Sequence, residues 1–211
     1  MTGEASETAG LLRRAAQGDQ AAWGALLVRS RGRLRRMVAL RLDRRLHGRI
    51  DPSDIIQEAY IDASARLAEY ARQPDMPFFL WLRFLTGQRL LRVHRQHLGA
   101  EMRDVAREVS LYRGALPAAT SAALAAQLLG RDTRPSEAAV RAERSIRLQE
   151  ALNSMEPLDR EVLALRHFEQ LNNGEVAATL GINESTASSR YLRALKRLKD
   201  EVQNIPGLFG P

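Results

Sequence analysis

Apolar positions recur every three to four residues along most of the chain, which is the spacing of amphipathic helices. The first such stretch runs from Thr8 to Ser30, and it is interrupted at Gly18 and Asp19, where we expect one helix to end and the next to begin. Alternating strand patterns are almost absent, and residues that favour helices dominate. The pattern therefore predicts an all-α fold.

The helical pattern weakens in the middle of the chain. It dissolves after about Val105, and Pro117 and Pro135 punctuate the segment that follows. We predict two small helical domains, over residues 1–106 and 137–211, joined by a linker over residues 107–136 with some helical turns of its own. The second domain is expected to be a four-helix unit.

A short helix, a glycine turn and a longer basic helix are predicted over residues 172–199. Val176, Ala177 and Leu180 give the first helix an apolar face, and Gly181 can leave right-handed helical space. Asn183 is a suitable N-cap for the second helix. This is the pattern of a helix-turn-helix.

The second helix of this pair has an apolar face from Ala187 to Val202 and a polar face opposite to it. Hydroxyl and guanidinium groups on the polar face can contact base edges and phosphates in a major groove. The candidate DNA-contacting residues are Ser185, Thr186, Ser188, Ser189, Arg190, Arg193 and Arg197. A solvated basic helix on a small bundle is the alternative, and the preceding turn favours DNA binding.

The amino-terminal half combines a basic segment with an acidic helix face. Nine arginines and one aspartate lie between Arg29 and Arg49, a density that calls for a compensating anion. The sequence at 51–54 predicts a helix start, after which Asp54, Glu58 and Asp62 fall on one side of the helix. That face is expected to contact either the domain's own arginines or a basic protein surface, and composition leaves both open.

Aromatic residues cluster just before a second basic helix. Phe78, Phe79 and Trp81 precede a run of arginines, a combination that suits single-stranded nucleic acid because rings stack on bases and arginines hold phosphates. The alternative is that the rings are core. We expect Phe78 and Leu82 to be buried, and leave Trp81 open between core and partial exposure.

Composition indicates the kind of partner and excludes some classes of site. The formal net charge of +7 and the pI of about 10.6 favour a polyanionic partner. The chain has no cysteine, and we identify no signal peptide or membrane span, so we expect a cytoplasmic protein without disulfides. His94 and His97 are flanked by arginines and lack a carboxylate partner, so we expect no metal, no cofactor and no catalytic residues.

Four motifs, in this order, resemble the small two-domain bacterial sigma factors of the extracytoplasmic-function (ECF) class, within the sigma-70 superfamily. They are Leu11 to Leu26 with Gly18-Asp19 and Trp23, then Asp54 to Tyr60, then Pro77-Phe78 with Trp81-Leu82, and lastly Glu175 to Ala194 with Leu180-Gly181-Ile182. The resemblance covers nearly the whole chain.

The resemblance implies a factor that binds core RNA polymerase, directs it to promoter DNA and helps to melt the promoter. It implies polymerase contacts at Asp54, Ile55, Gln57, Glu58 and Asp62, and contacts to the single-stranded minus-ten element at Phe79, Trp81, Arg83, Gln88, Arg89, Arg92 and Arg95. The helix-turn-helix residues above would read the duplex minus-thirty-five element. Whether an anti-sigma factor binds the protein is left open.

The chain departs from the family pattern in both reading helices. Gln88 and Arg92 stand where the family usually has asparagine and aspartate, and Ala187 and Ser188 stand where a valine-lysine pair is common. Base preferences therefore do not transfer. The alternative function is a helix-turn-helix regulator that acts without polymerase; a nucleic-acid enzyme would need a nucleophile or metal carboxylates that the sequence does not offer.

Overall fold

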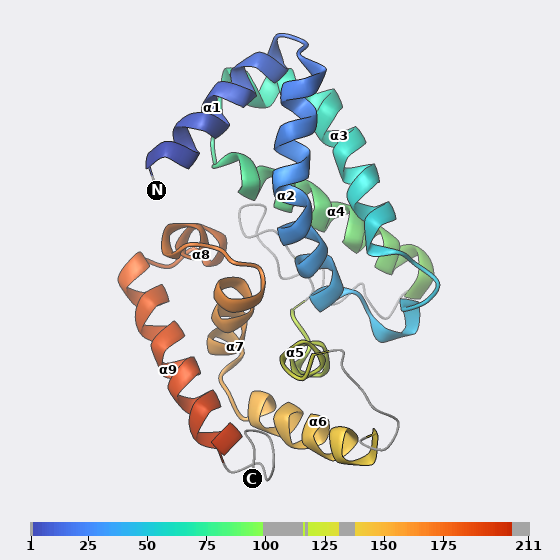
Figure 1. The fold of residues 1–211 in the computed structure, drawn as a ribbon, viewed down its shortest axis with the longest axis vertical. Helices are drawn as coiled ribbons and strands as arrows, with labels where there is room; N and C mark the ends of the chain where they lie inside the picture. Colours follow the sequence, from blue (N-terminus) through green and yellow to red (C-terminus); the bar gives the residue numbers. More distant parts are fainter. Residues whose placement is uncertain (1, 99–115, 117, 131–137, 204–211) are drawn as a thin grey trace. The chain divides into compact units, whose positions relative to one another are not determined.

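The computed structural model describes residues 2–98, 116, 118–130 and 138–203. Within these residues every regular element is helical, which confirms the predicted all-α fold (Figure 1). The chain divides into two compact units, Met1–Pro117 and Ala118–Pro211. No helix in the described ranges combines the length and apolar character needed to cross a membrane.

The first unit contains α1 (Thr2–Ala16), α2 (Gln20–Arg41), the short 3-10 helix η1 (Arg44–Leu46), α3 (Pro52–Arg72) and α4 (Phe78–Leu98). The break between α1 and α2 falls where it was predicted, because Gly18 has a positive φ of 96° and the Asp19 carboxylate accepts a hydrogen bond from the Ala22 amide. Asp51 caps α3 in the same way, with Pro52 in its first turn.

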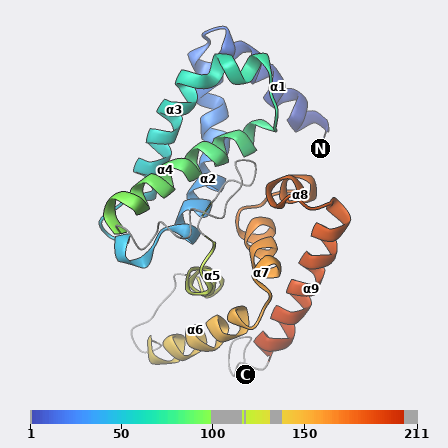
Figure 2. The same cartoon turned by 180° about the vertical axis from the view of Figure 1, so that it is seen from behind.

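Helix α2 is the centre of this unit and packs against α1, α3 and α4, and α4 crosses α2 and α3 (Figures 1 and 2). Leu34, Met37 and Val38 of α2 are fully buried, so the arginine-dense helix has the single apolar stripe that its sequence predicts. One glycine of α4 permits a close approach: a Cβ on Gly87 would lie 1.9 Å from Cδ2 of Leu116.

The second unit contains α5 (Ser121–Leu128), α6 (Ala138–Asn153), α7 (Pro157–Leu163), the π-helical turn η4 (Ala164–Phe168), α8 (Asn173–Leu180) and α9 (Glu184–Gln203). Helix α9 packs against α6, α7 and α8. Figure 1 shows α9 alongside α7, with α8 joined to its amino-terminal end. Leu148, Leu152, Val162 and Leu165 lie in the core between these helices.

Helix α5 lies in the range predicted as a linker, where some helical turns were expected. Thr120 caps α5, which packs against α6, and the Ser121 hydroxyl donates to Asn153 Oδ1 at 2.6 Å. Leu124 and Ala125 are fully buried, so this alanine-rich segment is a packed helix of the second unit. Residues 107–115, 117 and 131–136 of the predicted linker lie outside the described residues, and the predicted domain limits stay a prediction.

Candidate nucleic-acid and polymerase interfaces

Local contacts fix the turn between α8 and α9. Asn172 and Glu175 form a reciprocal capping box at the start of α8, with both hydrogen bonds at 2.9 Å. Gly181 ends α8 in the left-handed conformation, at φ 61° and ψ 38°. Asn183 then accepts a hydrogen bond from the Thr186 amide at 2.7 Å, as expected of an N-cap. These contacts confirm the predicted helix-turn-helix geometry.

Helix α9 has one buried face and one exposed face. Ala187, Ala194, Leu198 and Val202 are buried, as the sequence predicted. Among the predicted DNA-contacting residues, Ser185, Ser189, Arg193 and Arg197 are exposed, whereas Thr186 and Ser188 are half-buried. The exposed set is accessible to a duplex, since it lies away from the core of its own unit.

Arg190 differs from the exposed residues of α9. It was predicted to contact DNA, but in the structure it is bound to carboxylates of its own unit. Its guanidinium lies 2.6 Å from the Asp159 carboxylate and 3.0 Å from that of Glu156, and only 21% of its side chain is exposed. The hydrogen bonds to Asp159 and then Glu156 raise the pKa of Arg190 above its ordinary value. Arg190 therefore fastens α9 to α7. Its partners lie more than thirty residues away in the sequence, so helical spacing alone did not reveal them.

The acidic face of α3 is partly occupied by an arginine of the same unit. Arg89 of α4 donates to both Asp62 oxygens, at 2.5 Å and 2.6 Å, and contacts Glu58 at 3.2 Å. The hydrogen bond from Arg89 holds the pKa of the Asp62 carboxyl below its ordinary value. The acidic face was expected to contact either the domain's own arginines or a basic protein surface, and Asp62 contacts an arginine of its own domain.

Of the remaining predicted polymerase contacts, three are exposed and one is buried. Asp54, Gln57 and Glu58 are exposed on α3 and share one face. Ile55 is only 2% exposed and lies in the core, so its predicted role as a surface contact is wrong. Its position next to Asp54 in the motif placed it in the set, but the helical rotation of about 100° per residue turns it inward.

Three predicted minus-ten contacts are also core residues. Phe79, Trp81 and Arg83 are all buried, so their side chains are not available on the surface as predicted. Trp81 stacks on Tyr70 with ring centroids 4.3 Å apart, and Phe79 lies beneath the Arg33 guanidinium at 3.5 Å. Phe78 and Leu82 are buried as expected.

The exposed face of α4 is polar and cationic. Gln88, Arg92 and Arg95 are exposed, and they recur four and three residues apart, so they share one face of the helix. Arg89 is half-buried in its contacts with α3. The structure thus retains three of the seven predicted minus-ten residues as an accessible set.

His94 lies under this surface and supports it. It is 2% exposed, and its Nε2 accepts a hydrogen bond from the Asp43 amide at 3.3 Å. Burial lowers the pKa of His94 below its ordinary value, which keeps the ring neutral. His97 is exposed, and no group of three or more potential metal ligands occurs among the described residues.

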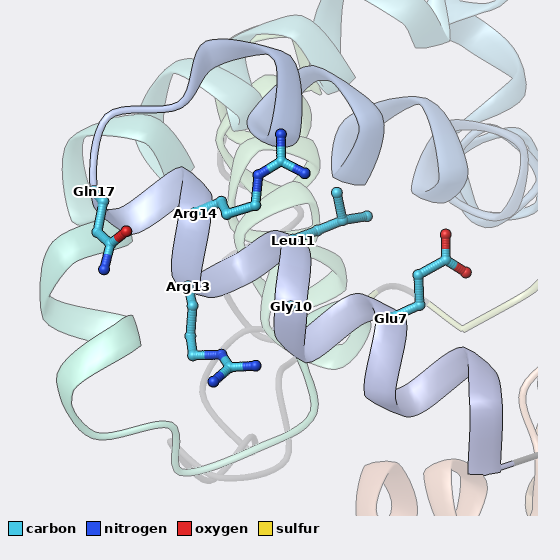
Figure 3. A pocket seen from close by; sticks show the side chains of 6 residues that line it. All are labelled: Glu7, Gly10, Leu11, Arg13, Arg14 and Gln17. Carbon is cyan, nitrogen blue, oxygen red and sulfur yellow. The ribbon is translucent and has the colours of Figure 1, made fainter.

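A shallow hollow lies on α1, lined by Glu7, Gly10, Leu11, Arg13, Arg14 and Gln17 (Figure 3). All six residues come from that one helix, and Arg14 is held by Asp19 at 2.6 Å. None of the predicted site residues lines it. The hollow adds nothing to the candidate interfaces.

Comparison with known proteins agrees with this geometry. Residues 145–198, from α6 to α9, match the family model "Sigma-70, region 4". The ECF RNA polymerase sigma factor SigD of Mycobacterium bovis is 29% identical over 153 residues, which cover 72% of this chain and 64% of that protein. The chain is therefore similar to ECF sigma factors, and its residues 145–198 resemble region 4 of sigma-70 factors. The region 4 match contains all of α8 and α9 as far as Leu198.

Higher identities cover shorter stretches. The RNA polymerase sigma-E factor of Streptomyces antibioticus is 41% identical over 56 residues, which are 26% of this chain and 31% of that protein. The sigma-E factor of Streptomyces coelicolor is 42% identical over 55 residues. The chain therefore spans about a third of the length of these relatives in the matched region.

A solved structure shows the same fold. The structure of CnrH in complex with the cytosolic domain of CnrY superposes with a TM-score of 0.53 at 21% sequence identity, over 93% of this chain and 97% of that chain. At this identity the likeness concerns the fold alone.

Proposed function

We propose that this protein binds core RNA polymerase and directs it to specific promoters, where it takes part in the initiation of transcription. The observation that carries the proposal is the exposed face of α9, with Ser185, Ser189 and Arg193 presented by a helix-turn-helix whose turn is held by Gly181. This helix enters the major groove of the duplex minus-thirty-five element. The similarity to sigma-70 region 4 and to ECF sigma factors supports the assignment.

Helix α4 contacts the minus-ten element through its exposed face. Gln88, Arg92 and Arg95 hold the backbone and base edges of the separated strand, because amides and guanidinium groups suit both. The buried aromatic residues, Trp81 among them, give α4 a rigid base and do not themselves stack on bases. This assignment replaces the aromatic platform that the sequence had indicated.

The exposed residues of α3 dock on the polymerase. Asp54, Gln57 and Glu58 form a compact polar face with two carboxylates, which fits a basic surface on the partner. Arg89 compensates the charge of Asp62, so Asp54 and Glu58 are the carboxylates that this face offers to a partner.

The proposal is tested by reconstitution. Purified protein is mixed with core polymerase, and the complex is assayed for co-elution and for transcription from promoters mapped after overexpression. We expect a complex and transcripts with defined start sites. Tight binding to paired half-sites by the free protein, without transcription on any mapped promoter, would overturn the proposal in favour of a polymerase-independent regulator.

Three further points belong to the proposal. The protein acts by binding and carries out no catalysis, since its role is to position polymerase and DNA. It works in the cytoplasm, where its two partners are. An anti-sigma factor controls it, by analogy with CnrH, which was solved with the cytosolic domain of CnrY.

A further inference from the structure

Helix α9 carries a leucine on its exposed face. Leu192 is 63% exposed, although Leu198 on the same helix is buried and Leu195 is half-buried. Single exposed leucines are common on protein surfaces and need no explanation in general. Leu192 differs because of the surface on which it lies.

The helical register places Leu192 among the residues that face the duplex. Ser185, Ser189, Leu192 and Lys196 follow one another at intervals of four, three and four residues, and all four are exposed. Ala187, Ala194 and Leu198, on the opposite face, are buried. Leu192 therefore projects from the same side as Ser189, one turn further along α9.

The surroundings of Leu192 suit a nucleic acid better than an apolar protein surface. Arg193 and Lys196 are exposed beside it, and Ser189 precedes it by three residues, so the leucine is a single apolar point in a cationic and hydroxyl-bearing face. An apolar docking patch would need several such residues together. The cationic side chains of this face can contact DNA phosphates on either side of a groove, and the leucine can contact an apolar group inside that groove.

The major groove offers one apolar group, the C5-methyl of thymine. We propose that Leu192 is a specificity-determining residue that packs on a thymine methyl in the duplex read by α9. The proposal rests on the function proposed above, since it requires α9 to enter the groove. It assigns to Leu192 a preference for a C5-methylated pyrimidine at one position of the promoter element.

The ion pairs of Arg190 support this assignment, because they hold Arg190 away from the exposed face of α9. Because Arg190 is tied to Asp159 and Glu156, the orientation of α9 is fixed from the side of α7 and not by phosphate contacts of that arginine. The rotation of the helix, and hence the direction of Leu192, is then set within the protein before DNA binds.

The test uses the polymerase holoenzyme formed with the full chain. Duplexes are first selected by the holoenzyme from a pool randomised in the minus-thirty-five region. In the selected duplex each thymine is then replaced, one at a time, by deoxyuridine, which lacks only the methyl group. We expect one position at which the replacement weakens binding by about fourfold, the value of one buried methyl-sized group.

Matched variants isolate the leucine. In Leu192→Ala the difference between thymine and deoxyuridine at that position should disappear, whereas Leu192→Met should retain it. Lys196→Ala, on the same face, should weaken all duplexes alike and preserve the difference. Alanine and methionine are good helix formers and the site is exposed, so α9 should stay folded.

The outcomes separate this inference from the proposed function. If the parent holoenzyme selects no sequence, the proposed function fails. If it selects a sequence but no thymine in it depends on its methyl group, or the dependence persists in Leu192→Ala, Leu192 is not the reader and the inference is overturned while the function stands.

Discussion

Individual charged residues in this protein divide into those that hold the fold and those that face a partner. Arg190 and Arg193 lie three residues apart on α9, yet Arg190 is bound to two carboxylates of its own unit and Arg193 is exposed. Arg89 and Arg92 on α4 differ in the same way, since Arg89 contacts Asp62 and Arg92 is exposed. Residue type alone does not distinguish the two roles.

Substitution of the two arginines of α9 should have opposite effects. Arg190→Ala should lower the thermal unfolding temperature, because it leaves the Asp159 carboxylate without its partner, and should leave the salt dependence of promoter binding unchanged. Arg193→Ala should leave the unfolding temperature unchanged and reduce the slope of log K against log salt by about 1, if it contacts a phosphate. Scanning calorimetry and salt titrations of the holoenzyme measure the two quantities.

Asp159→Asn serves as a control for the first effect, since it should destabilise α9 without touching DNA. A reduced salt slope in Arg190→Ala at full thermal stability would contradict the structural role of Arg190.

His94 should make the stability of the first unit depend on pH. Its pKa is lowered in the folded state by burial, so as the pH falls the unfolded chain takes up the proton first. The contribution of the neutral ring is therefore fully present above its ordinary pKa of about 6.5 and declines as the pH falls below that value. Asp43, which raises the pKa, and Arg45, which lowers it, are the charged groups near the ring.

Urea denaturation at about pH 7.5 and pH 5.5 tests this effect. The parent should lose more unfolding free energy over this interval than His94→Gln, whose amide oxygen can still accept from the Asp43 amide. His97→Gln, at an exposed position, should behave like the parent. Equal losses in the parent and His94→Gln would show that His94 does not titrate on unfolding.

At the scale of elements, the sequence predicted the features that depend on residues close together in the chain, namely the helix caps and turns. The caps at Asp19, Asp51 and Asn183 and the turn at Gly181 form within a few residues, so their residue types revealed them. The sequence did not predict that the aromatic residues of α4 are buried, because Phe79 is covered by Arg33 from another helix. Contacts between distant elements decided which side of α4 is surface.

The sequence indicated helical turns near α5 but did not reveal how they pack. The segment is rich in alanine and short, so its periodicity is weak, and its packing against α6, with Leu124 buried, makes it a defined element of the second unit. On α9 the helical spacing did not reveal the ion pairs of Arg190, because its partners come from α7 and the residue before it.

The connection between η4 and α8 contains a backbone position that a different residue would fill better. Gln170 has a positive φ of 58°, a conformation that costs a non-glycine residue about 1 kcal/mol. Gln170→Gly should therefore raise the unfolding free energy by up to about 1 kcal/mol, and Gln170→Val should lower it. Chemical denaturation measures both, and a less stable glycine variant would refute the account of strain at this turn.

At the scale of the whole molecule, polymerase docking and the reading of the minus-thirty-five element are assigned to separate units. The docking residues Asp54, Gln57 and Glu58 lie in Met1–Pro117, and the helix-turn-helix lies in Ala118–Pro211. Damage to the docking surface should therefore leave the helix-turn-helix intact.

Glu58→Arg tests this separation. The substitution puts a cation on a face that is expected to meet a basic partner, so co-elution with core polymerase should be lost, while Arg89 keeps Asp62 and the unit stays folded. Glu69→Arg, exposed near the end of the same helix, is the matched control and should bind normally. Unchanged polymerase affinity in Glu58→Arg would remove α3 from the docking surface.

The two faces of α9 also differ in how much they contribute to the fold. Its packing depends on Ala187, Ala194 and Leu198 and on the tie of Arg190 to α7, whereas Ser185, Ser189 and Leu192 contribute little to the core. Exposed substitutions away from structural contacts usually change stability by less than about 0.5 kcal/mol. Substitutions at these exposed positions should therefore alter what α9 binds while the fold of its unit stays intact.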